Sequence, residues 1–216
     1  MAAEPLTLED NRLFRWADQM PAALWDDLDR RDPAEAARAA GGEWLPAAAP
    51  GGAVSLSMLN REYLIMPQAR QVRLAARPDY RVSYQSALVL VSTLARAVEA
   101  PPSGRMVTAR ELPGGDLFFQ GPHAIPIRPL EKRFGARPAE LLERAAALGG
   151  EPWEGGDAAV KLHGLPRLPL YVLVWGDDGE FAARAVVGFD SRAPFHLALD
   201  GIWALANLMV HRLSGE

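Results

Sequence analysis

The sequence "LYVLVWGDDGEFAARAVVGFD", residues 170–190, places an acidic, glycine-containing segment between two apolar runs. Short apolar runs bounded by turn residues are typical of strands. The Asp and Gly residues of "GDDG" provide the positive φ angles that a tight hairpin requires. We therefore predict an antiparallel hairpin in which Asp177 and Asp178 point to water. The alternative is a metal or acid–base site formed by these carboxylates with Glu180, which would require the backbone to turn them inward.

The other segments mix helix and strand signals without a regular βαβα alternation. Val54, Leu56 and Met58 alternate with serines, which predicts a half-buried strand. Asn60 then predicts a hairpin into the next segment. The predicted strands are residues 53–59, 62–67 and 71–75, two short strands within 105–121, and residues 158–165, 168–176 and 180–190. The predicted helices are residues 7–20, 21–31, 32–42, 83–100, 127–135, 137–150 and 199–213. This order predicts an α+β fold: a mostly antiparallel mixed sheet with packed helices and an N-terminal helical segment.

A connector rich in Pro, Ala and Gly at residues 44–52 predicts a change of organisation. Before it, Asp32 is a predicted N-cap and Gly41 a predicted C-terminal stop of a short helix. We therefore predict an N-terminal helical segment over residues 1–45 and an α+β domain over residues 46–216.

The composition limits the classes of function. A net charge of −4 and a pI near 5.6 disfavour sequence-independent binding of nucleic acid, which requires a basic face. The chain has no cysteine, which excludes disulfides, thiolate nucleophiles and cysteine-based iron–sulfur or zinc sites. The first ten residues carry acids where a signal peptide has bases, and no apolar run reaches the roughly 20 residues of a spanning helix. We expect a cytoplasmic protein that binds neither nucleic acid nor membrane.

No compact catalytic or cofactor motif is present. The patterns GxGxxG, GxxxxGK[ST], HExxH and GxSxG are all missing. The four histidines are dispersed, so no metal ligands are assigned, and any cofactor is unknown. Candidate site residues are therefore isolated side chains.

Three candidates lie in the second half of the chain. Asp190 ends a predicted strand, where side chains reach clefts, although it also fits an Asx-turn cap. His196 follows six residues later and can fold back towards it. Arg167 lies in the rigid segment "GLPRLPL", which can direct a guanidinium at an anion or at a structural carboxylate.

Three further candidates surround a Gly-Gly turn. The segment "ARELPGGDLFF" carries Arg110, Glu111 and Asp116. Its glycines can admit a ligand close to the backbone, although a plain hairpin needs them too.

These motifs together resemble the uncharacterised domain-of-unknown-function family 3786. The resemblance covers roughly residues 50–213 and is most specific in the last 70 or so. It is carried by the "PGGD" turn, the "PRLPL" step, a strand ending in Trp, the acidic "EF" hairpin, "FD" and the closing helix. The resemblance implies a bacterial or archaeal protein without an assigned activity. Some relatives look as though they carry a cysteine-rich iron–sulfur segment beside this domain, a pattern from which this cysteine-free chain departs. The recurring positions that it implies are Arg110, Glu111, Gly114, Gly115, Asp157, Pro166, Arg167, Pro169, Trp175, Glu180, Phe181, Phe189 and Asp190.

Two main interpretations of function follow. The first is a non-catalytic binding or accessory module for a small anionic ligand or a protein partner. The second is a small carboxylate-dependent hydrolase or transferase, with or without a divalent metal, which requires Glu180, Asp190 and His196 to converge. Self-association as a homodimer also stays open, since Trp16, Trp25 and other aromatic residues suit an interface.

Overall fold

The computed structural model describes residues 15–215 and has an α+β fold, as predicted. Within these residues the strands form two antiparallel sheets rather than one. The first has the order β1-β2-β3-β4 and is formed by β1 (Glu43–Leu45), β2 (Ala53–Met58), β3 (Arg61–Met66) and β4 (Gln71–Leu74). The second has the order β5-β9-β8-β7-β6 and is formed by β5 (Met106–Thr108), β6 (Glu151–Pro152), β7 (Ala158–Leu165), β8 (Leu168–Trp175) and β9 (Arg184–Asp190).

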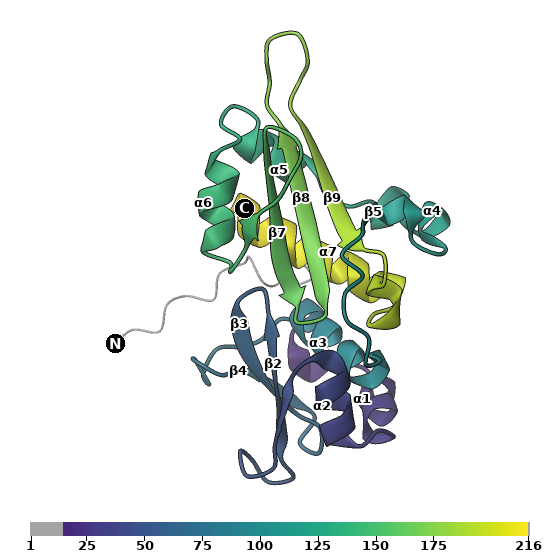
Figure 1. The fold of residues 1–216 in the computed structure, drawn as a ribbon. Coiled ribbons are helices and arrows are strands. Elements are labelled where there is room, and N and C mark those ends of the chain that lie inside the picture. Colours follow the sequence, from purple (N-terminus) through teal and green to yellow (C-terminus); the bar gives the residue numbers. More distant parts are fainter. Residues whose placement is uncertain (1–14, 216) are drawn as a thin grey trace.

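The predicted hairpin of residues 170–190 forms the centre of the five-stranded sheet. Its register pairs Leu170 with Phe189 and Trp175 with Arg184. The connection is longer than the tight turn that we predicted, because β9 begins only at Arg184. Aspartate side chains order the loop: Asp177 accepts a hydrogen bond from the Gly179 amide at 2.9 Å, and Asp178 accepts one from the Phe181 amide at 2.7 Å. The hairpin extends past the end of the sheet (Figure 1).

Two long helices, α3 (Tyr84–Arg96) and α7 (Leu199–Ser214), pack against each other in the core that the two sheets share. α7 is buried on nearly every side, as its apolar sequence predicts. It crosses behind β7, β8 and β9 and packs against α3 (Figure 1). α5 (Arg128–Phe134) and α6 (Glu140–Ala146) pack beside it. One continuous apolar core contains side chains from both sheets and from these helices.

The N-terminal part contains α1 (Ala22–Asp29) and α2 (Pro33–Ala40). Asp32 caps α2 by accepting from the Glu35 amide, and Gly41 ends it in the left-handed conformation, both as predicted. Most of the helix predicted over residues 7–20 lies outside the described residues; Ala17–Gln19 form a 3₁₀ turn. The division of the chain at residue 45 stays a prediction.

The second short strand that we predicted within residues 105–121 is wrong. After β5 the chain makes a 3₁₀ turn and then α4 (Gly115–Phe118). Gly114 has a φ of +75°, and the Gly115 amide donates to the carbonyl of Leu112 at 2.7 Å. A Cβ atom at Gly115 would clash with the carbonyl oxygen of Ala109. The two glycines thus fold the chain back on itself instead of extending it along β9.

No helix among residues 15–215 is long and apolar enough to cross a membrane.

Candidate functional site

Asp190 serves to attach a loop to the end of β9. Its side chain is 1% exposed. The carboxylate accepts hydrogen bonds from the amides of Ser103 at 3.0 Å and Gly104 at 2.8 Å, and from the Ser103 hydroxyl. It also accepts from the Arg192 amide at 2.9 Å, which is the Asx-turn geometry. These donors satisfy both oxygens of the carboxylate. Asp190 therefore holds the connector Ala97–Arg105 against the sheet.

Arg167 and His196 lie close enough to influence each other electrostatically, and each packs against backbone. Arg167 packs on Gly41 and donates from Nη2 to the carbonyl of Arg38 at 2.9 Å, at the C-terminal end of α2. Cations stabilise that end of a helix. His196 is buried beside the backbone of Ala100. Burial lowers the pKa of His196 and the nearby Arg167 guanidinium lowers it further, while Asp190 and Ala100 act in the opposite direction. Through its bond to Arg38, Arg167 therefore attaches the turn between β7 and β8 to the end of α2.

Glu111 and Glu180 occupy separate positions. Glu111 accepts from the amide of Thr108 at 2.7 Å and from its hydroxyl at 2.8 Å. These bonds lower the pKa of the Glu111 carboxyl and form a capping box. Glu180 is exposed at the hairpin tip, beyond the opposite end of β9 from Asp190. A seven-residue strand spans about 20 Å at about 3.3 Å per residue, so the two carboxylates do not share a site. Among residues 15–215 no group of three His, Cys, Asp or Glu side chains could hold a metal ion.

Arg110 and Asp116 lie in a groove beside β9. Two adjoining pockets, of about 610 and 540 Å³, share Arg110, Phe119 and Ala124 as lining residues. We call them together the β9-edge groove. Its remaining lining residues are Thr108, Ala109, Asp116, Gln120, Gly121, Ile125, Ile127, Arg184, Ala185, Val186 and Val187. A volume of this size is in the range of pockets that enclose small ligands.

The groove exists because β5 is shorter than β9. β5 pairs only with Gly188–Asp190, so the edge of β9 from Arg184 to Val187 that faces away from β8 has no neighbouring strand among residues 15–215. The chain then returns through α4 and a following loop, which brings Phe119, Ile125 and Ile127 opposite that edge. The Ala185 amide donates to Oε1 of Glu131 at 3.2 Å, in the position where a strand would have offered a carbonyl.

Charge is available in this groove. Within residues 15–215 neither the Arg110 nor the Arg184 guanidinium forms an ion pair or a hydrogen bond. Arg184 stacks over the ring of Trp175 with 4.9 Å between its Cζ and the ring centroid. Asp116 lines the more polar of the two pockets, and its carboxylate also makes no ion pair in this part of the chain. The groove thus combines two arginines and one carboxylate with an apolar wall.

Sequence reasoning identified Arg110 and Asp116 but missed Arg184, Ile125 and Ile127. Arg184 was assigned to the interior of a strand, Ile127 to the start of the helix predicted over residues 127–135, and Ile125 to the loop before that helix. One signal in the sequence pointed to the groove: the short segment "MVT" cannot pair with the whole of the longer run that ends at Asp190, so part of that run keeps a free edge.

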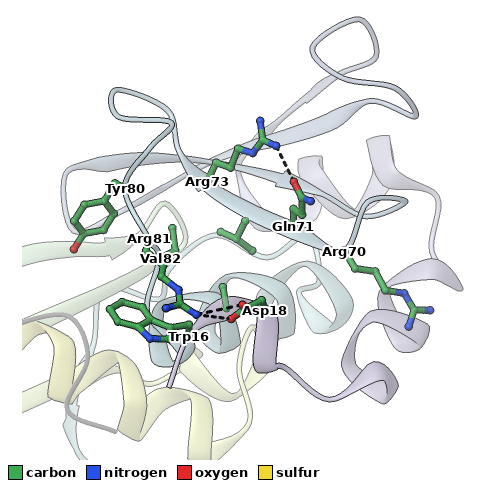
Figure 2. Close-up of a pocket in the computed structure, with 10 residues that line it drawn as sticks. Trp16, Asp18, Arg70, Gln71, Arg73, Tyr80, Arg81 and Val82 are labelled. Carbon is green, nitrogen blue, oxygen red and sulfur yellow. Dashed lines mark hydrogen bonds and ion pairs between the residues drawn. The ribbon is translucent and has the colours of Figure 1, made fainter. Parts of the chain in front are cut away.

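A second arginine-rich pocket uses its charges internally (Figure 2). It has a volume of about 230 Å³ and lies beside β4. Arg81 pairs with Asp18 at 3.3 Å and stacks on Trp16, and Arg73 bonds to Gln71 at 2.9 Å. Arg70 points away from the pocket (Figure 2) and pairs with Asp26 at 2.6 Å. We therefore regard the β9-edge groove as the stronger candidate site.

Comparison with protein families gives one match. A family model described as a domain of unknown function, DUF3786, matches residues 32–212, which is well over half of the chain. Neither the curated proteins nor the solved structures give a match. The chain belongs to the DUF3786 family.

Proposed function

We propose that this member of the family is a non-catalytic binding module that holds an anionic group attached to an apolar body. The proposed site is the β9-edge groove. One observation carries the proposal: Arg110 and Arg184 make no ion pair within the described residues and line a groove whose wall is Phe119, Ile125 and Ile127.

The chemistry of the lining supports this ligand class. A guanidinium offers several donors in a planar array that matches carboxylate, sulfonate or phosphate oxygens. The apolar wall gains free energy from covering an apolar body, at about 25 cal/mol per Å² of area removed from water. A small hydrophilic anion would use the arginines alone, and a neutral apolar molecule would leave them unpaired. A ligand with both parts uses the whole groove.

The carboxylate-dependent hydrolase or transferase is the weaker candidate. Its residues were Glu180, Asp190 and His196. Asp190 already accepts hydrogen bonds from four donor groups of the described residues, and β9 separates it from Glu180. A cytoplasmic location is part of the proposal and is supported by the absence of cysteine, since a reducing compartment makes no use of disulfides.

Titration with 1-anilinonaphthalene-8-sulfonate tests the groove, because this fluorescent probe is an apolar anion. We expect one saturable site per chain and at least tenfold weaker binding by Arg110→Gln/Arg184→Gln. The matched control is Arg30→Gln, which removes an exposed arginine paired with Asp27 on α1 and should bind the probe as the unmodified chain does. Equal affinity of all three proteins would overturn the proposal.

A further inference from the structure

The tip of the β8–β9 hairpin, Asp177–Phe181, presents an aromatic ring to solvent. Phe181 is 67% exposed. The loop around it is fixed, because Oδ1 of Asp178 accepts from the amides of Phe181 at 2.7 Å and Glu180 at 3.0 Å. These two bonds lower the pKa of the Asp178 carboxyl and keep it ionised. The tip is therefore an ordered loop that carries a phenyl ring among three carboxylates.

This chemistry complements the β9-edge groove. The groove is lined by Arg110 and Arg184 beside an apolar wall. The tip offers an apolar ring beside the carboxylates of Asp177 and Glu180. We propose that the tip of one copy of this chain inserts Phe181 into the β9-edge groove of a second copy. This inference rests on the proposed function, because it names the partner of the same groove.

The positions of the two surfaces allow a closed dimer. β9 begins at Arg184, which lines the groove, and the hairpin leaves that same end of the strand and projects beyond the sheet (Figure 1). The tip is thus directed away from its own groove. In a twofold arrangement, insertion of one tip into the groove of the second copy implies the reciprocal insertion of the second tip into the first groove. An interface in which each copy contributes both surfaces closes as a twofold dimer.

The dimer should be weak. A loop tip and a groove bury less area than the roughly 1,600 Å² of a standard interface, even when the contact occurs twice. We expect half-dissociation in the range of about 1–100 µM, which corresponds to a standard free energy of roughly −8.2 to −5.5 kcal/mol.

Sedimentation analysis between low micromolar and several hundred micromolar protein tests the association. Phe181→Ser should raise the half-dissociation concentration at least tenfold. Phe195→Ser is the matched control, because Phe195 is also half exposed, at 51%, but lies outside the tip and the groove. Association that survives Phe181→Ser, or a chain that remains monomeric throughout, overturns the inference.

Cross-linking tests the contact itself with no background, because the chain has no cysteine. A Glu180→Cys chain mixed with an Ala124→Cys chain should give a heterodimer with a short bismaleimide, since Ala124 lines both pockets of the groove. The control mixture replaces Ala124→Cys with Glu35→Cys on α2, which is exposed and distant in sequence. Equal cross-linking of the two mixtures would count against the tip-to-groove contact.

The outcomes separate the two proposals. Binding of 1-anilinonaphthalene-8-sulfonate is measured with dilute protein, at which the groove is open. If Arg110→Gln/Arg184→Gln loses the probe while the unmodified chain never associates, the binding groove stands and the second copy is not its partner. If the probe is unaffected by both arginines, the proposed function fails whatever the association state.

Discussion

The two ends of β9 differ in how their polar groups are used. At the C-terminal end, Asp190 is buried and its carboxylate is filled by donors from the connector and from Arg192. At the N-terminal end, Arg184 lines an open groove without an ion pair within the described residues, and the adjoining tip exposes Phe181. From the sequence, Asp190 was a site candidate at one end, whereas Arg184 at the other end was missed. The difference shows that a charged residue at a strand end becomes a structural element when loop amides reach it, and remains available when the neighbouring strand stops short.

The largest expected effect on stability is at the C-terminal end of β9, where hydrogen-bond donors satisfy the Asp190 carboxylate. Asp190→Ala removes the acceptor of three part-buried amide hydrogen bonds at once. Unsatisfied donors keep their full desolvation penalty, so we expect a loss of about 3–5 kcal/mol in the free energy of unfolding. Urea unfolding measures it. Glu180→Ala, at the opposite end, should leave the urea midpoint unchanged. A small effect of Asp190→Ala would remove the distinction between the ends.

The second effect concerns the turn at Gly114 and Gly115, which leads the chain from β5 into the wall of the groove. Gly115 lies against the carbonyl of Ala109, where a Cβ atom has no room. Gly115→Ala should therefore cost about 1–3 kcal/mol, as for other forced overpacking. Because α4 and its loop form the wall of the groove, the same variant should weaken binding of 1-anilinonaphthalene-8-sulfonate. Unchanged probe binding at reduced stability would mean that the wall does not depend on this turn.

A third effect appears in the pH dependence of stability. Burial and Arg167 lower the pKa of His196 in the folded chain from its ordinary value of 6.5. The unfolded chain therefore binds the proton more readily than the folded chain. The contribution of His196 to the free energy of unfolding is fully present above about pH 6.5, and it is lost as the pH falls towards the lowered pKa of the folded chain. The slope for one proton is at most about 1.4 kcal/mol per pH unit.

The difference between the unmodified chain and His196→Gln isolates this contribution, because all other titrating groups are common to both. Urea midpoints from pH 8 to pH 5 should converge as the pH falls. Parallel pH profiles for the two proteins would show that His196 is not protonated more easily in the unfolded chain.

The strands and helix caps that depend on residues close together in the chain were predicted from the sequence. Alternation and turn residues located β2, β3, β8 and the helix caps at Asp32 and Gly41. The sequence did not predict that "DLFF" would form a helical turn, because both a hairpin and a fold-back need the glycines at 114 and 115. The candidate site was half predicted: Arg110 and Asp116 were named from their own turn. The groove itself arises from the short pairing of β5 with β9, which depends on contacts between residues about 80 positions apart.

The smallest effect compares two arginines that sequence reasoning treated alike. Arg167 donates to the last turn of α2, so Arg167→Gln should lower the free energy of unfolding by about 1 kcal/mol and leave binding of 1-anilinonaphthalene-8-sulfonate unchanged. Arg110 makes no hydrogen bond or ion pair within residues 15–215, so Arg110→Gln should leave the urea midpoint unchanged and weaken probe binding. Each substitution is the control for the other, since both exchange the same charge for the same amide. If both variants lose stability, or both lose the probe, then Arg110 and Arg167 do not belong to the separate structural and binding regions that the two ends of β9 define.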